Sequence, residues 1–156
     1  METQATEITE TETLLEQAMS FNHSRLIHRL SVLLSAYEDR YDVLPELEFE
    51  LAAGRLKPDV ALLTKQAVDW EMDIVRFPHP PITAIEILSP TQALDGLVAK
   101  IRHGYFTSGV QSAWLIVPVL RTITIYIPGQ AAVAVNSGSA RDTVTGVEIE
   151  LDALFS

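Results

Sequence analysis

An apolar segment with a carboxylate in its middle limits what this chain can fold into. Residues 80–90 read Pro-Pro-Ile-Thr-Ala-Ile-Glu-Ile-Leu-Ser-Pro, a run of mostly apolar side chains with prolines at both ends. Such a run is typical of a buried strand. Glu86 lies inside it, and burying an ionised carboxylate is costly unless a cation or hydrogen-bond donors contact it. The sequence therefore predicts a buried strand whose glutamate has a polar partner.

Asp59 and Lys100 are the candidate neighbours of Glu86. Asp59 opens a second apolar run directly after a proline, a position typical of the start of a strand. Lys100 falls on the helix expected after the Glu86 strand, on a flank otherwise formed by small residues. Two carboxylates on adjacent strands with a nearby lysine can hold a divalent cation and polarise a phosphodiester. The candidate ligands of that cation are Asp59, Glu86 and the main-chain carbonyl of Ile87.

Each of these residues also has a purely structural interpretation. Asp59 would then be a turn residue, Lys100 a surface lysine, and Glu86 the buried half of a salt bridge. The sequence contains no P-loop, no Gly-x-Gly-x-x-Gly and no Gly-x-Ser-x-Gly motif. Phosphate binding through a glycine-rich loop and catalysis by a serine in a nucleophile elbow are therefore disfavoured.

The remaining patterns predict a single α/β domain at residues 17–156 after a flexible leader at residues 1–16. We expect an amphipathic helix that Asn22 caps, and a second helix that Thr91 caps and Gly109 ends. Strands are expected at residues 43–51, 58–63, 82–88, 112–117, 122–127, 131–135 and 147–151, with loops at 64–79 and 136–139. The strand–helix–strand order around the second helix predicts a parallel pair with a right-handed crossover.

Composition limits the class of protein. The chain has 156 residues, no cysteine, and no apolar run near the roughly 20 residues that span a bilayer. Disulfides, thiolate catalysis and zinc–cysteine sites are therefore excluded, and we expect a cytoplasmic protein that does not enter the membrane. The formal net charge of −10 argues against non-specific wrapping of nucleic acid. Any contact with DNA should therefore be local.

Further polar residues are candidates for supporting roles. Alternation in residues 43–51 places Glu46, Glu48 and Glu50 on one face, which is either exposed to solvent or directed at the site. Basic residues cluster early in each of the two helices, where they are either solvated or directed at a substrate. The candidate accessory residues are Glu48, Glu50, His23 and Tyr105, and the candidate substrate-binding residues are Arg25, Arg29 and Arg102.

Several segments together resemble one protein family. They are Asp59 in Lys-Pro-Asp-Val, Glu86 in Ile-Glu-Ile-Leu-Ser-Pro, then Lys100, Tyr105, Gly109-Val110, and Ala-Trp-Leu-Ile-Val-Pro at residues 113–118. In order and spacing they resemble the Uma family of restriction endonucleases, part of the PD-(D/E)XK nuclease superfamily. The resemblance extends over roughly residues 20–128.

This resemblance implies an α/β fold with a restriction-endonuclease-like core, in which helices flank a mixed central sheet. It also implies cleavage of DNA that depends on Mg²⁺ or Mn²⁺, with Asp59 and Glu86 as metal ligands. The superfamily pattern has a lysine two residues after the second acid, and this chain has Leu88 there. Lys100 matches the family's recurrent lysine on the following helix and is therefore the candidate catalytic cation.

Two other functions fit the same residues. A nuclease-fold protein without turnover would bind nucleic acid or a partner protein and leave DNA uncut. A structural interaction module would use Glu86 and Lys100 only as a buried ion pair, and chelators would leave its stability unchanged. A homodimer is a further expectation, since the hairpin at residues 122–135 can present a sheet edge.

Overall fold

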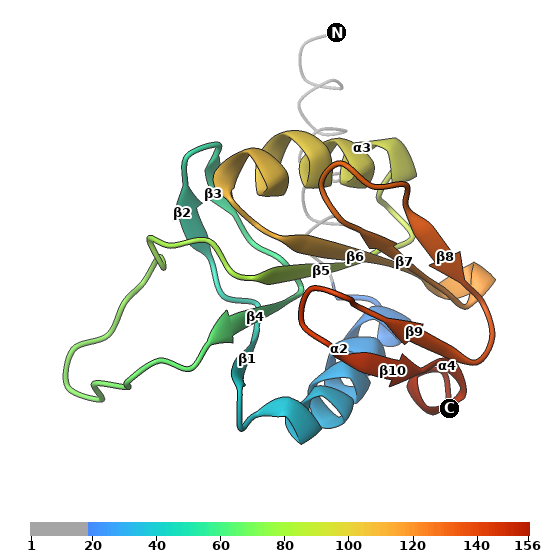
Figure 1. Ribbon diagram of the computed structural model, residues 1–156, viewed down its shortest axis with the longest axis horizontal. Coiled ribbons are helices and arrows are strands. Elements are labelled where there is room, and N and C mark those ends of the chain that lie inside the picture. The colour runs from blue at the N-terminus through green and yellow to red at the C-terminus, as the bar shows by residue number, and fades with distance from the viewer. Residues whose placement is uncertain (1–18) are drawn as a thin grey trace, which may run out of the picture.

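A six-stranded mixed sheet forms the centre of the protein (Figure 1). The computed structural model describes residues 19–156, and the leader expected at residues 1–16 lies outside them. The strands in spatial order are β1 (Tyr41–Pro45), β4 (Val60–Thr64), β5 (Thr83–Ile87), β6 (Ser112–Val117), β7 (Thr122–Tyr126) and β8 (Val133–Val135). β5 and β6 run parallel, and the other neighbouring strands run antiparallel. The predicted parallel pair and the predicted mixed sheet are confirmed.

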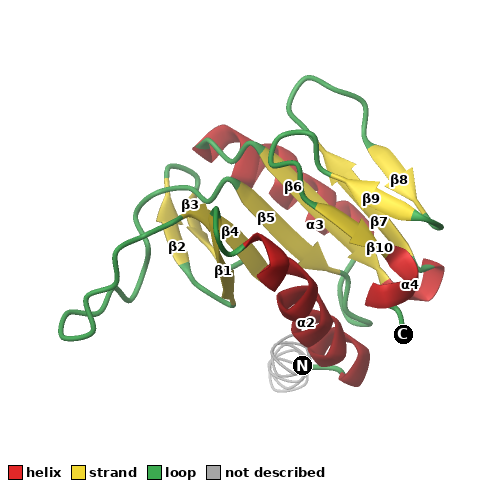
Figure 2. Cartoon of the chain, turned by 60° about the horizontal axis from the view of Figure 1, so that its bottom comes forward, coloured by secondary structure: helices red, strands yellow, loops and turns green. Residues whose placement is uncertain are grey.

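Helices and small hairpins cover both faces of this sheet (Figures 1 and 2). On one face lie α2 (Phe21–Leu34), α4 (Leu151–Leu154) and the hairpin of β9 (Ser139–Arg141) with β10 (Glu148–Glu150). On the other lies α3 (Leu94–Ala99), which continues as a π-helix (Lys100–Tyr105). A hairpin of β2 (Phe49–Leu51) with β3 (Gly54–Leu56) and short 3₁₀ turns at Ser35–Tyr37, Phe106–Ser108 and Pro118–Leu120 complete the fold. None of the helices within residues 19–156 has the length and apolar character of a membrane span.

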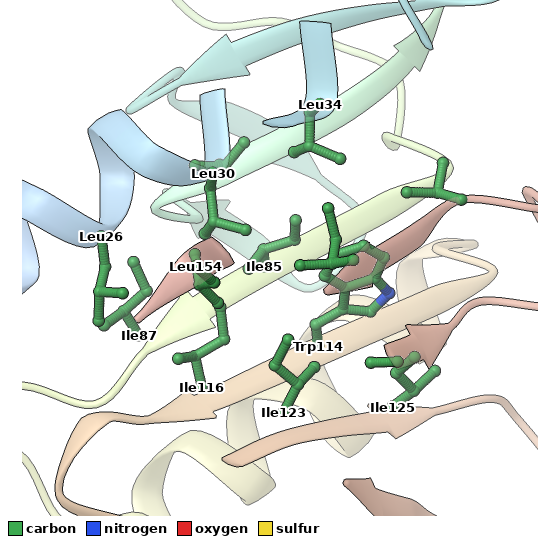
Figure 3. Packing of buried hydrophobic residues seen from close by; sticks show 14 of the residues in the cluster. Leu26, Leu30, Leu34, Ile85, Ile87, Trp114, Ile116, Ile123, Ile125 and Leu154 are labelled. Carbon is green, nitrogen blue, oxygen red and sulfur yellow. The ribbon is translucent and has the colours of Figure 1, made fainter. Parts of the chain in front are cut away.

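Alternation along β5 divides the core between the two faces. Ile85 and Ile87 pack with α2 and α4 in the larger apolar cluster (Figure 3), and Ala84 packs with α3 in a second cluster. All five residues of β5 are buried. Because side chains alternate with a period of two, Glu86 shares the face of Ala84 and points toward α3. The fold therefore directs the one charged side chain of this strand at a helix.

Two predicted strand boundaries are wrong. The strand expected at residues 43–51 is broken between β1 and β2, because the backbone turns at Glu46, whose φ of 57° is left-handed. β1 then pairs with β4, while β2 folds back on β3 as a separate hairpin. At the other end of the chain, Ser139 belongs to a strand and not to the predicted loop, since β9 pairs with β10.

The predicted helix starts also shift. Ser20 caps α2 in place of Asn22, because its hydroxyl accepts a hydrogen bond from the N–H of His23. After β5, a turn closed by the N–H of Gln92 and the carbonyl of Ser89 delays the next helix to Leu94, so Thr91 is not its cap. Gly109 ends the helical segment as predicted, with a left-handed φ of 98°.

A buried carboxylate that the sequence does not single out fixes the β9–β10 hairpin to the central sheet. Asp142 follows β9 and has no exposed surface. Its Oδ2 accepts hydrogen bonds from Ser112 Oγ at 2.5 Å and Trp114 Nε1 at 2.8 Å, both on β6. Its Oδ1 accepts one from the N–H of Val144 at 2.8 Å. Two elements distant in sequence therefore share one hydrogen-bond acceptor.

Replacing Asp142 with alanine is expected to lower the free energy of unfolding by about 3 kcal/mol, because at least two buried donors lose their acceptor. Urea denaturation would measure the loss. Asp39→Ala, at an exposed site, is the matched control and should change the free energy by less than about 0.5 kcal/mol. Equal losses in the two variants would contradict this role of Asp142.

Candidate active site

Glu86 is a buried carboxylate that two side chains of the α3 face contact. The residue is 2% exposed. Its Oε1 lies 2.6 Å from Lys100 Nζ and accepts a hydrogen bond from the Tyr105 hydroxyl. The Lys100 side chain is 28% exposed, so its ammonium touches both the buried carboxylate and the solvent-facing side of the helix. The polar partner expected for the strand glutamate is present.

A π-helical turn explains how Lys100 and Tyr105 reach the same oxygen. In an α-helix successive side chains are rotated by about 100° around the helix axis, so the side chains of residues five positions apart point in different directions. Here the helix widens, and the N–H of Phe106 donates to the carbonyl of Ile101, five residues earlier. This spacing brings Lys100 and Tyr105 onto one face, toward β5. Such turns occur frequently at functional sites.

Asp59 lies directly before β4 and across from Glu86. The antiparallel register of β4 and β5, continued by one residue, puts these two acids opposite each other. Asp59 Oδ2 accepts a hydrogen bond from the N–H of Ile87 at 2.7 Å, and its Oδ1 lies 2.8 Å from His23 Nε2. The structure thus brings together six of the candidate residues: Asp59, Glu86, Ile87, Lys100, Tyr105 and His23.

The contact of His23 with Asp59 is the part of this group that the sequence analysis missed. His23 was a candidate accessory residue without a named partner. It lies in the first turn of α2 and is 7% exposed. Its spacing to Leu26 and Leu30 continues the apolar stripe of the helix, so the side chain points at the sheet. That spacing was the signal in the sequence that His23 is buried.

Burial and neighbouring charges shift the protonation of these groups. Desolvation raises the pKa of Glu86, while the Lys100 ammonium opposes this shift and the Asp59 carboxylate adds to it. The hydrogen bond to Asp59 raises the pKa of His23. Burial, with the adjacent Glu86 charge, raises the pKa of Tyr105, so the phenol stays protonated and acts as a donor. Because the carboxylates of Glu86 and Asp59 are close together and shielded from water, a further positive charge beside them is favoured.

The donor set fits a hard divalent cation. Mg²⁺ is usually held by one or two carboxylates, with water completing its shell. Asp59 and Glu86 supply two carboxylates from neighbouring strands, and Lys100 and Tyr105 occupy only Oε1 of Glu86. Within residues 19–156, no three side chains of His, Asp or Glu are grouped to hold a metal. The other ligands would therefore be water and a main-chain oxygen such as the carbonyl of Ile87.

Two adjoining cavities lie near the start of α2, and of the six residues only His23 is in the lining of either. The first, about 470 Å³, lies between His23 and the segments that follow β5 and β6, including Ser89 and Val119. The second, also about 470 Å³, shares part of this lining and extends to Arg25 and Arg121. Ligands of α/β proteins bind outside the carboxyl ends of parallel strands, which is where the first cavity lies.

Four of the remaining candidate residues lie elsewhere. Glu48 Oε2 is 3.4 Å from Arg76 Nε, and Glu50 is exposed on β2. Arg29 is half-buried on α2. The Arg102 guanidinium lies over the Tyr126 ring, 5.5 Å from its centre. The structure does not bring these residues to Asp59 and Glu86.

Arg25 has an intermediate position. It lines the second cavity but donates two hydrogen bonds, from Nε and Nη2, to the carbonyl of Ser156. This contact fixes the guanidinium at the cavity wall, on the same side of the sheet end as His23.

The stability of His23 variants at different pH values tests the contact with Asp59. Because the folded-state pKa of His23 lies above its unfolded value of about 6.5, its stabilising contribution is complete below that pH. The contribution is lost as pH rises through the folded-state pKa. His23→Gln should therefore reduce the free energy of unfolding most below about pH 6.5 and progressively less at higher pH.

Urea denaturation in buffers with a chelator measures this effect without any metal. His28→Gln, which changes an exposed histidine on the same helix, is the control and should show no such trend. A loss in His23→Gln that is the same at every pH would contradict the predicted ion pair.

Comparisons with known proteins identify the fold and the family. The chain is similar in structure to a crystal structure of a putative nuclease belonging to DUF820 from Anabaena variabilis. The TM-score is 0.76 and the identity 23%, covering 87% of this chain and 81% of that chain. This similarity confirms the predicted nuclease-like α/β fold. No curated protein matches the chain.

The sequence also matches a family model that agrees with the expected resemblance. The Uma2 model, described as "Putative restriction endonuclease", matches residues 2–152. Because this match covers nearly the whole chain, the protein belongs to the Uma2 family of restriction-endonuclease-like proteins.

Proposed function

We propose that the protein is a metal-dependent endonuclease that hydrolyses phosphodiester bonds in DNA. The observation that carries the proposal is the pairing of Lys100 with the buried Glu86 at 2.6 Å, across from Asp59 in the strand register. Membership of the Uma2 family supports the same class of hydrolase. An acidic pair can hold a cation that activates water, and a fixed lysine can stabilise the charge of a phosphodiester in its transition state.

Each residue has a distinct proposed role. Asp59, Glu86 and the carbonyl of Ile87 would hold Mg²⁺ or Mn²⁺, and the cation would supply an acidified water and positive charge for the phosphate. Lys100 directs its ammonium at the attacking water and the scissile phosphate, where negative charge increases in the transition state. Tyr105, as a neutral donor, fixes Oε1 of Glu86 and so orients the carboxylate that would hold the cation.

We place the DNA backbone along the arginine-lined cavity. The protein has a formal net charge of −10, so attraction to phosphates must come from a local group of cations. Arg25 and Arg121 line the second cavity, which adjoins the cavity beside His23. Arg121 also has a left-handed backbone with φ of 49°, a strained conformation of the kind found at binding sites.

A nuclease-fold protein that binds DNA or a partner without cleaving is the second candidate. One observation favours it. Both oxygens of Asp59 and Oε1 of Glu86 already have partners within the protein, as expected for a purely structural polar network. Cleavage assays on variants of Lys100 separate the two functions.

Lys100→Met is expected to lower the rate of DNA cleavage by about 10²-fold or more, because it removes a cation that stabilises the transition state. The same change leaves Glu86 without its cation and should destabilise the fold by roughly 3–5 kcal/mol. Cleavage of supercoiled plasmid with Mg²⁺ or Mn²⁺, together with urea denaturation, measures both effects. Lys57→Met, at an exposed lysine near Asp59, is the matched control and should keep both activity and stability.

A double variant separates catalysis from folding. Glu86→Gln combined with Lys100→Met removes the buried charge of Glu86 together with its partner and should recover much of the lost stability, since no charge is left unpaired. It should not recover cleavage. A Lys100→Met protein that cleaves at the parental rate would exclude Lys100 as the catalytic cation.

Added metal is expected to raise the melting temperature. A cation that binds only the folded state stabilises it by RT ln(1 + [L]/Kd), about 2.7 kcal/mol at a concentration of 100 Kd. Calorimetry with Mg²⁺, Mn²⁺ or a chelator measures the shift, which Asp59→Asn and Glu86→Gln should each abolish. An identical melting temperature with metal and with chelator would contradict a metal site.

A further inference from the structure

His23 is a buried polar side chain to which the proposed function gives no role. It lies in the first turn of α2, where the hydroxyl of Ser20 accepts a hydrogen bond from its N–H and so fixes the start of the helix. The side chain points at the sheet, and its Nε2 lies 2.8 Å from Oδ1 of Asp59. An ionised carboxylate only accepts hydrogen bonds, so Nε2 carries the proton and is the donor.

The packing of α2 on the sheet does not require this polar contact. Leu26, Leu30 and Leu34 follow His23 on the same face of the helix, and all three are buried against the sheet (Figure 3). An apolar side chain at position 23 would continue this stripe, and apolar side chains often stabilise a core as well as a buried polar pair does. A histidine at this position therefore indicates a role at Asp59.

The carboxylate of Asp59 has one hydrogen-bond donor on each oxygen. His23 donates to Oδ1 from α2, and the N–H of Ile87 donates to Oδ2 from β5 at 2.7 Å. A carboxylate has about four lone-pair directions, so two donors fix its plane and still leave directions for a cation. Ile87 alone would hold one oxygen and allow the carboxylate to turn. Both donors are therefore needed to fix the direction of Asp59.

The other acid of the site is held in a comparable way. Lys100 and Tyr105 contact Oε1 of Glu86 from the α3 side of the sheet, and His23 contacts Asp59 from the α2 side. Each acid thus has a partner from a different helical layer. In the part of the chain that the structure describes, no three side chains of His, Asp or Glu are grouped to hold a metal. His23 is therefore not assigned as a ligand itself.

We propose that His23 is a positioning residue of the candidate site, and that it orients the Asp59 carboxylate for a divalent cation. This role rests on the proposed function, because it concerns the same two acids. Hydrogen-bond partners of metal ligands fix the direction of the ligand, and their replacement typically lowers metal affinity by about 10- to 100-fold. His23 acts through Asp59 and contacts neither the cation nor the DNA.

Binding of Mn²⁺ to the full chain, without DNA, tests this role. In isothermal titration calorimetry, His23→Leu should raise the dissociation constant for Mn²⁺ by about 10- to 100-fold. Leucine is apolar like the rest of the stripe, so the fold should persist, but it cannot donate to Asp59. His28→Leu, at an exposed histidine of the same helix, is the matched control and should bind Mn²⁺ like the parental protein.

Two amide variants keep the test decisive if leucine disturbs the start of the helix. The amide nitrogen of glutamine reaches about as far from the backbone as Nε2 of histidine, so His23→Gln should still donate to Asp59 and keep most of the affinity. The amide of asparagine is one bond shorter, so His23→Asn should bind Mn²⁺ as weakly as His23→Leu. Both amides are polar and neutral, so a general loss of stability would not separate them.

The dependence of cleavage on metal concentration provides a second readout. In His23→Leu a positioning defect should raise the Mn²⁺ concentration needed for half-maximal cleavage, and excess Mn²⁺ should restore most of the rate. Lys100→Met removes a group that acts on the phosphate, so its maximal rate should stay low at every Mn²⁺ concentration.

The results distinguish a failure of this role from a failure of the proposed function. A parental protein that binds no Mn²⁺ would overturn the metal site and the role of His23 with it. A parental protein that binds Mn²⁺ while His23→Leu binds it equally well would overturn the role of His23 alone. So would equal weakening in His23→Gln and His23→Asn, because the donor to Asp59 would then have no part in the effect.

Discussion

The structure depends on how one charged side chain is accommodated in a buried strand. β5 contacts the apolar clusters on both faces of the sheet, so the charge of Glu86 must be balanced within a few ångströms. Lys100 supplies that balance from the helix above, and the π-helical turn that positions it also directs Tyr105 to the same oxygen. The placement of this helix on the sheet is therefore tied to the candidate site. A shift of one residue along the helix would leave a buried carboxylate without a cation.

Asp59 connects the sheet to α2, the helix on the face opposite α3. Its two oxygens contact Ile87 on β5 and His23 on α2, so one side chain connects two strands of the sheet with the helix on the opposite face from α3. The two acids and their partners thus fix both helical layers relative to the end of the sheet. Local unfolding of the first turn of α2 or of the π-helical turn would therefore remove partners of these carboxylates.

The sequence predicted the sheet better than the site. Strands with continuous apolar runs, such as Ser112–Val117, have clear patterns, and the parallel pair follows from the strand–helix–strand order. The pairing of His23 with Asp59 was not predicted, because it joins residues 36 positions apart on different elements. The π-helical turn was not predicted either, since apolar periodicity reports an average helix and not one inserted residue. The break at Glu46 has no sequence signal of its own, because a left-handed glutamate is uncommon.

The charge arrangement itself favours chemistry over stability. A buried ion pair is weak support for a fold, since apolar side chains of similar volume often stabilise a core equally well or better. Here the pair of Glu86 and Lys100 is accompanied by a second carboxylate, Asp59, whose charge raises the pKa of Glu86 and so works against the ionised state. A core selected for stability alone would have little use for two adjacent acids. In the proposed function, a bound cation would offset the repulsion between the two carboxylates, and the Lys100 ammonium would offset the charge of a phosphate.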